Sequence, residues 1–167
     1  QFSLDLAGKY AFAYQLAMLI SMVSSGLFSA YMPRFYEHRN REAFGEIQSL
    51  FTRNLRLLLA ASAVLILLSG PVALLIGSRN PAYLESLPVI PIIITGYLFV
   101  WLGQCHGLYV SFRRKFIFLQ SMTLVAAAAA NVGLNVWLLP RYGFEPKVAA
   151  LNTLAAFFLQ WALCYLI

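Results

Sequence analysis

The chain has 167 residues, of which 61% are hydrophobic and 11% are charged, with a formal net charge of +6. Soluble domains carry about 25% charged residues, so this composition excludes an ordinary soluble domain. The excess of basic residues lies beside long apolar stretches, as in membrane proteins, and does not indicate nucleic-acid binding.

All charged side chains fall outside five uncharged stretches. Each stretch has about 20 residues or more, and a helix of that length crosses the roughly 30 Å hydrocarbon core of a bilayer. We therefore predict an all-α fold, a polytopic transmembrane bundle of about five helices that forms one transmembrane domain. The predicted spans cover residues 10–32, 57–76, 88–112, 116–139 and 148–167.

The segment between the first two spans is amphipathic. Its apolar residues recur at helical spacing, at Phe44, Ile47, Phe51 and Leu55. This pattern predicts an interfacial helix over residues 40–56 that leads into the second span. The alternative is a solvated linker with one apolar face.

The later spans carry signals of helix packing. The third contains Gly103-x-x-x-Gly107, a spacing that allows close approach of helices. The basic residues 113–115 form a tight loop, which makes the third and fourth spans antiparallel neighbours. The fourth places Asn131 and Asn135 one turn apart. Because a buried amide needs a partner, this face is expected to look into protein or a wet cavity.

Basic residues are distributed unevenly between the two sides of the predicted bundle. The first and third loops hold eight Lys and Arg residues, and the opposite side holds four. The positive-inside rule places those loops and the C-terminus in the cytoplasm. Since an odd number of spans begins outside and the first residue is Gln1, we expect further sequence to precede this chain.

No arrangement typical of an enzyme is visible in the sequence. The spans contain no carboxylate pair, no Ser/His/Asp set and no metal-ligand spacing, so we predict neither catalysis nor a cofactor. Cys105 and Cys164 fall within predicted spans, where they serve as small apolar residues. The spans also lack an acidic residue, so a carboxylate that couples transport to an ion would lie elsewhere.

Uncharged polar residues at membrane depth are the candidate functional residues. Amides both donate and accept hydrogen bonds, so as a set they suit a hydrophilic cavity for hydroxyl-rich cargo. Interhelical hydrogen bonding is the alternative. The histidine of the third span is either a proton or substrate contact or a packing residue. The candidate cavity-lining residues are Gln15, Gln104, His106, Asn131 and Asn135.

Basic residues at the predicted cytoplasmic boundary are candidates for a second kind of contact. Each suits an anionic lipid headgroup or a pyrophosphate and contributes about 1 kcal/mol near an anionic surface. The alternative is that they only fix the topology of the chain. These candidates are Arg34, Arg113, Arg114 and Lys115.

Three local patterns carry a resemblance to a known family. Residues 8–13 read Gly-Lys-Tyr-Ala-Phe-Ala, residues 32–37 read Met-Pro-Arg-Phe-Tyr-Glu, and residues 131–143 carry two Asn four apart followed by Leu-Pro-Arg-Tyr-Gly. In this order they resemble motifs of the polysaccharide and O-antigen flippases, within the multidrug/oligosaccharidyl-lipid/polysaccharide exporter superfamily. The resemblance covers essentially the whole chain, which is similar to the last five helices of the twelve-helix form.

The resemblance implies one part of a two-lobed transporter. Such a protein flips a lipid-linked oligosaccharide by alternating access during cell-surface polysaccharide biosynthesis, including that of lipopolysaccharide. Its partners are the lipid bilayer, the lipid-linked oligosaccharide and a missing N-terminal lobe of the same chain. Residues 144–150 depart from the family, because they replace its usual Gly-Ala-Ala turn. Two alternatives stay open: another transporter of the superfamily, exporting drugs or a peptidoglycan precursor, and a non-transport scaffold subunit.

Overall fold

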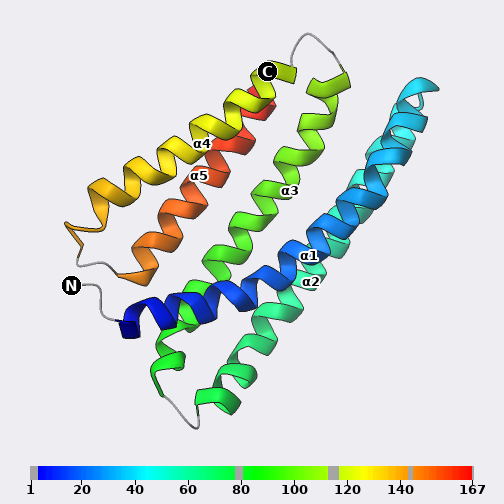
Figure 1. Ribbon diagram of the computed structural model, residues 1–167. Coiled ribbons are helices and arrows are strands. Elements are labelled where there is room, and N and C mark those ends of the chain that lie inside the picture. The colour runs from blue at the N-terminus through cyan, green and yellow to red at the C-terminus, as the bar shows by residue number, and fades with distance from the viewer. Residues whose placement is uncertain (1–3, 78–80, 113–116, 143–144, 167) are drawn as a thin grey trace.

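The fold is a bundle of long α-helices (Figure 1). The computed structural model describes residues 4–77, 81–112, 117–142 and 145–166, and none of these forms a strand. In chain order the elements are α1 (Leu4–Asn40), α2 (Phe44–Gly77), the 3-10 helix η1 (Pro81–Val89), α3 (Ile90–Phe112), α4 (Ile117–Leu138) and α5 (Pro146–Leu166). Within these ranges, five helices are long and apolar enough to cross a membrane. The prediction of an all-α bundle with about five spans is confirmed, and the chain is a multi-pass membrane protein.

Helix α3 lies at the centre of the arrangement (Figure 1). Helix α5 packs along it on one side and α1 on the other, while α2 lies against α1 and α4 lies against α5. The α1–α2 turn, the end of α3 and the start of α4 are at the same end of the molecule. We call it the basic end, because it holds Arg34, Arg39, Arg41, Arg53 and Arg56.

Helix α1 is longer than the predicted first span. The helix does not end with the predicted span at residue 32, because α1 continues through Pro33 to Asn40. Pro33 has no backbone N–H, so one carbonyl of the preceding turn loses its hydrogen-bond partner. Pro33 is exposed and lies at the end of the uncharged stretch, where water can hydrate that carbonyl. The 37 residues of α1 correspond to about 55 Å, against roughly 30 Å of hydrocarbon core. Helix α1 therefore exceeds the length of a perpendicular crossing.

The amphipathic segment 40–56 is not a separate helix. Most of it forms the first part of α2, which continues to Gly77 without a break at Pro71. Its apolar stripe is covered in part, since Ile47 is 1% exposed, Phe51 and Leu55 are half-buried, and Phe44 is 53% exposed. The prediction of a helix that leads into the second span is confirmed from Phe44 onward, and the alternative of a linker is wrong. Its place at a membrane interface stays a prediction.

A tight turn reverses the chain between α1 and α2. The amide of Ala43 donates to the carbonyl of His38 at 2.9 Å, and the amide of Glu42 donates to that of Arg39 at 3.2 Å. These two bonds define a Schellman motif. Glu42 occupies its left-handed position with φ of 57°, where glycine is usual because it has no Cβ.

Large aromatic side chains fill the core at the junction of three helices. Tyr31 and Phe35 of α1 and Trp101 of α3 are completely buried. Phe51 of α2 stacks on Trp101 with 5.3 Å between ring centroids. Aromatic side chains bury about 150–250 Å² each, so this cluster contributes strongly to the packing of α1, α2 and α3.

The close approach of α3 to its neighbours depends on glycine. A Cβ on Gly103 would lie 3.6 Å from the backbone Cα of Trp161 in α5. A Cβ on Gly107 would collide with the side chain of Gln120 in α4. The predicted close packing of this glycine pair is confirmed, with a different helix against each glycine.

Candidate functional site

The candidate residues in the spans occur at two depths. His106 lies six residues before the end of α3, at the basic end, whereas Asn131 lies fourteen residues after the start of α4. With a rise of 1.5 Å per residue, these positions are about 9 Å and about 20 Å from the basic end. The histidine and the asparagines therefore belong to separate sites.

Three asparagines form a hydrogen-bonded row between α4 and α5, which we call the amide row. Nδ2 of Asn135 donates to Oδ1 of Asn131 at 2.9 Å. Nδ2 of Asn152 donates to Oδ1 of Asn135, also at 2.9 Å. Asn152 is buried, and the other two are half-buried. This face of α4 looks into protein, and α5 supplies the partner that a membrane-buried amide needs.

The two glutamines of the candidate set do not join the amide row. Gln15 is exposed on α1, and α1 does not contact α4 within the part of the chain that the structure describes. Gln104 is half-buried on α3, and its Oε1 has no hydrogen-bond partner among the described residues. The structure thus brings together Asn131 and Asn135, and leaves the glutamines apart from them.

His106 lies in an aromatic environment between α2, α3 and α5. Its Nδ1 is 2.8 Å from the carbonyl oxygen of Leu102. Since a carbonyl only accepts, Nδ1 donates this hydrogen bond. The ring centroids of Tyr165 and Phe51 lie 5.4 Å and 6.4 Å away. A cavity of about 310 Å³ opens beside it, lined by Phe44, Gln48, Phe51, Cys105, His106 and Tyr109.

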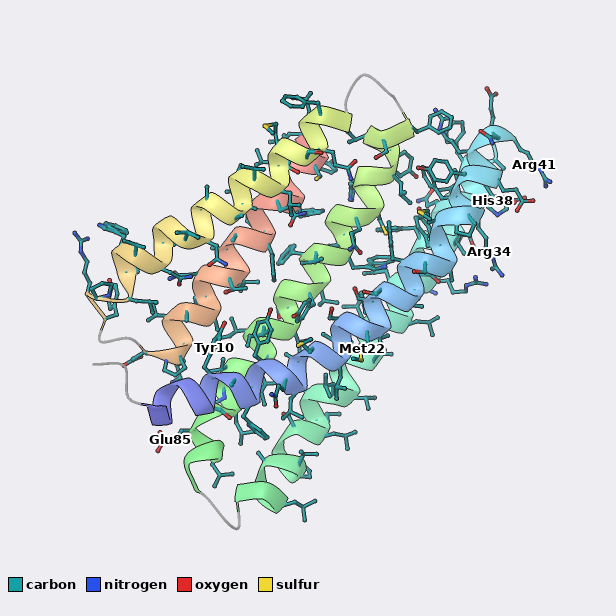
Figure 2. The ribbon with its side chains drawn as sticks, viewed as in Figure 1. Tyr10, Met22, Arg34, His38, Arg41 and Glu85 are labelled. Atoms are coloured by element: carbon teal, nitrogen blue, oxygen red, sulfur yellow. The ribbon has the colours of Figure 1, made fainter. Side chains whose placement is uncertain are left out.

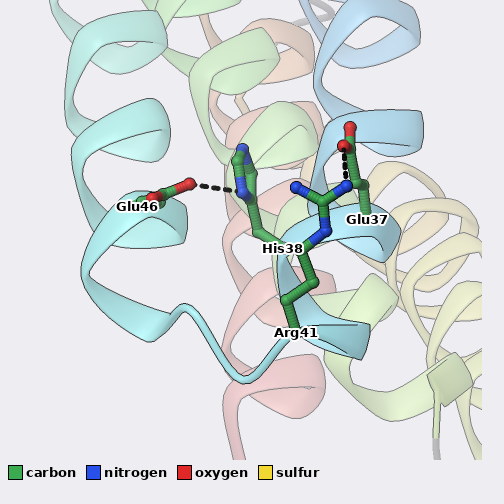
Figure 3. A network of polar contacts seen from close by, with 4 residues as sticks. All are labelled: Glu37, His38, Arg41 and Glu46. Atoms are coloured by element: carbon green, nitrogen blue, oxygen red, sulfur yellow. Dashed lines mark ion pairs between the residues drawn. The ribbon is translucent and has the colours of Figure 1, made fainter.

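Ion pairs occupy the tip of the α1–α2 hairpin. Figure 3 shows Nδ1 of His38 facing Oε2 of Glu46 across the two helices, at 2.6 Å. Nη2 of Arg41 lies 3.0 Å from Oε1 of Glu37, one turn earlier. Both residues of the Arg41 pair are exposed, so it contributes at most about 1 kcal/mol.

A cation–π contact connects this hairpin to the end of α3. The guanidinium carbon of Arg39 lies 4.7 Å from the ring centroid of Phe44 and 4.9 Å from that of Phe112. Arg39 is half-buried between these rings. Contacts of this kind contribute about 0.5–2 kcal/mol, more as the cation loses water. The side chain therefore has a structural role.

Arg34, a candidate headgroup contact, borders a cavity between α1 and α2 (Figure 2). The cavity has a volume of about 220 Å³, and Arg53 also lines it. Arg53 is absent from the sequence-based candidates, although a signal exists: it lies shortly before the uncharged stretch that begins at Leu57. The remaining basic candidates, Arg113, Arg114 and Lys115, lie outside the described residues.

The described residues offer no site for a metal ion, since they contain no group of three His, Cys, Asp or Glu side chains that could hold one. What the bundle presents is amide groups within the spans and a cluster of guanidinium groups at the basic end. No protein-family model, curated protein or solved structure matches this chain.

Proposed function

We propose that this chain is part of a flippase that moves a lipid-linked oligosaccharide across the inner membrane by alternating access. The observation that carries the proposal is the amide row. It places hydrogen-bonding side chains within a multi-pass bundle, at the two asparagines of the flippase-like motif. Transporters commonly bind substrate through groups near the middle of the bilayer. In this proposal the basic end and the C-terminus are cytoplasmic.

The amide row suits sugar hydroxyls because its hydrogen bonding is not exhausted. Each amide has two donor hydrogens and an accepting oxygen, and the row uses only part of this capacity. Asn131 and Asn135 are half-buried, so they are accessible at the edge of the α4–α5 pair. Asn152 ties α5 to α4, and the two helices move as one unit against the other lobe. Arg34 and the basic residues 113–115 contact phosphate groups at the cytoplasmic face, either of anionic lipids or of the cargo.

A scaffold role is the second candidate, and one observation favours it. The amides of the row are bonded to one another, as interhelical hydrogen bonding requires. Such bonds contribute about 0.6 kcal/mol each on average, enough to fix the rotation of two helices. In that case the chain is a non-transport subunit of a polysaccharide-assembly complex, and the row only holds α4 on α5.

Replacing the two accessible amides distinguishes these functions. The full-length protein with Asn131→Leu and Asn135→Leu is compared with Val132→Leu and Val136→Leu, which change exposed positions elsewhere on α4. The readouts are cell-surface polysaccharide at matched expression and the transport of a fluorescent lipid-linked oligosaccharide into vesicles. Loss of about 1.4 kcal/mol of contact with the cargo lowers transport about tenfold.

The outcomes separate the two candidates clearly. The flippase is supported if the wild type transports the lipid-linked oligosaccharide, the asparagine variant transports it less, and the valine variant transports it as the wild type does. Unchanged transport by the asparagine variant refutes the role of the amide row in cargo binding. A wild-type protein that moves no lipid-linked oligosaccharide in vesicles, yet is needed for polysaccharide in cells, supports the scaffold.

A further inference from the structure

Three arginines at the basic end have no ion-pair partner among the described residues. They are Arg34 on α1 and Arg53 and Arg56 on α2, and all three are exposed. Glu46 lines the cavity beside Arg34 but faces a histidine of α1, and Glu37 pairs with an arginine of the tip. The three guanidinium groups therefore leave a local excess of positive charge.

These arginines line one continuous surface, which we call the arginine crevice. The cavity of about 220 Å³ at Arg34 shares Ser49 and Arg53 with a cavity of about 700 Å³ along α2. The larger cavity is also lined by Thr52 and Arg56. Two hydroxyl groups and three guanidinium groups thus border these joined cavities, together with the amide of Gln48 and with His38 and Glu46, which face each other at 2.6 Å. The hydroxyl and guanidinium groups donate hydrogen bonds, which is the chemistry that an anion with several oxygen atoms requires.

The crevice lies at the boundary between charged and uncharged sequence on both helices. Arg34 directly follows the uncharged stretch of α1, and Arg56 directly precedes that of α2. The antiparallel hairpin brings these two boundaries to one hollow. Charges at this level face the phosphate layer of a bilayer, where an anionic surface attracts Lys and Arg.

The crevice continues onto an apolar surface. Leu57 and Ala60 line the same cavity as Arg53 and Arg56, and Leu57 is 53% exposed. A ligand that fits both parts has an anionic head and an apolar tail. Inorganic phosphate matches only the polar part, so the continuity favours a lipid.

We propose that the arginine crevice binds the phosphate group of an anionic lipid headgroup. The guanidinium groups of Arg34 and Arg53 approach the phosphate from α1 and α2, and Arg56 adds a third positive charge. Guanidinium presents paired N–H donors that match the spacing of phosphate oxygens. The lipid's acyl chains lie along the exposed side of α2 beyond Leu57. The proposal concerns a lipid held at the bundle surface, and it stands independently of transport.

The test measures lipid binding to the full-length protein in detergent by native mass spectrometry. The probes are phosphatidylglycerol, phosphatidylcholine and inorganic pyrophosphate, each added alone and in competition. The wild type is compared with Arg34→Gln plus Arg53→Gln, with the double Lys variant, and with Arg41→Gln as a control at the same end. At about fivefold for each arginine, the Gln variant loses about 25-fold in phosphatidylglycerol affinity. The Lys variant loses less, since it keeps charge without the paired donors.

Each outcome supports or overturns the site. Preference for phosphatidylglycerol that the Gln variant loses and Arg41→Gln retains supports it. If pyrophosphate does not displace the lipid, the site recognises a lipid headgroup, as proposed. If pyrophosphate binds alone and displaces the lipid, the site recognises a soluble phosphate group, and the proposal of a lipid site is wrong. Equal losses in the Gln variant and in Arg41→Gln indicate diffuse surface charge and overturn the proposal, as does unchanged binding. Because all substituted side chains are exposed, circular dichroism is expected to show intact folding of each variant.

Discussion

Replacement of Gly103 by leucine is predicted to force α3 and α5 apart. A Cβ at this position meets the backbone Cα of Trp161 at 3.6 Å, which is an ordinary carbon–carbon contact. The Cβ itself therefore fits, and Gly103→Ala is expected to be tolerated. Leucine adds three more carbon atoms beyond Cβ, and the backbone of α5 at Trp161 occupies the space that these atoms need. Gly133 of α4 is the matched control, because a Cβ there has no neighbour within 4 Å.

The expected magnitude follows from overpacking. Forcing extra carbon atoms into a packed interface costs about 1–3 kcal/mol. Both leucine variants also gain helix propensity, since glycine is less favourable than other residues by up to about 1 kcal/mol in a helix. Gly133→Leu is therefore neutral or slightly stabilising. The gain in propensity is common to both variants, so Gly103→Leu is destabilised relative to Gly133→Leu by the overpacking cost of about 1–3 kcal/mol.

The assay is unfolding of the purified full-length protein in mixed micelles by increasing sodium dodecyl sulfate, followed by circular dichroism. Tryptophan fluorescence reports separately on the α3–α5 contact, because Trp161 lies at the site of the change. The expected order of stability is Gly133→Leu, then wild type and Gly103→Ala, then Gly103→Leu. If the two leucine variants unfold within about 0.5 kcal/mol of each other, the argument from close backbone contact is wrong.

Two further predictions concern the basic end, and both use the same unfolding assay. Glu42→Gly relieves the left-handed strain of the turn and stabilises the protein by about 1 kcal/mol. Glu42→Ala keeps the Cβ, so it gains nothing; an equal gain would show that the carboxylate and not the backbone is unfavourable. Arg39→Gln loses contact with two aromatic rings and costs about 1 kcal/mol. Arg41→Gln removes only an exposed ion pair and changes stability by less, and equal losses would contradict the cation–π contact.

The ends of the last three helices and the C-terminal end of α2 could be predicted from the sequence, and both ends of α1 and the start of α2 could not. Helices α3, α4 and α5 begin and end within two residues of the predicted spans. Short connections follow these spans, so the limit of uncharged sequence coincides with the end of the helix. In the first two helices, residues beyond the uncharged stretches stay helical because they pack on one another. The first charged residue after an apolar stretch indicates the edge of the hydrocarbon core, but the helix can continue beyond it.

The candidate site was harder to predict than the spans, because apolar periodicity does not show which face of a membrane helix packs on protein. On α4, Val132 and Val136 are 64% and 72% exposed, while Ala127 is 4% exposed. Both faces are apolar, since lipid and protein interior favour the same side chains. Asn135 indicates the packed face correctly. Its partner Asn152 depends on the rotation of another helix, which the sequence of α4 does not specify.

The separation of the two polar regions limits how one lipid-linked molecule can use them. The arginine crevice belongs to the α1–α2 pair and lies at the boundary of the uncharged stretches. The amide row belongs to the α4–α5 pair, about 20 Å along α4 from that end, and α3 lies between the pairs. A lipid-linked molecule whose phosphate lies in the crevice does not bring its first sugars to the amides. The lipid in the crevice and the cargo at the amide row are therefore separate molecules, and substitutions in the crevice are expected to leave binding at the amide row unchanged.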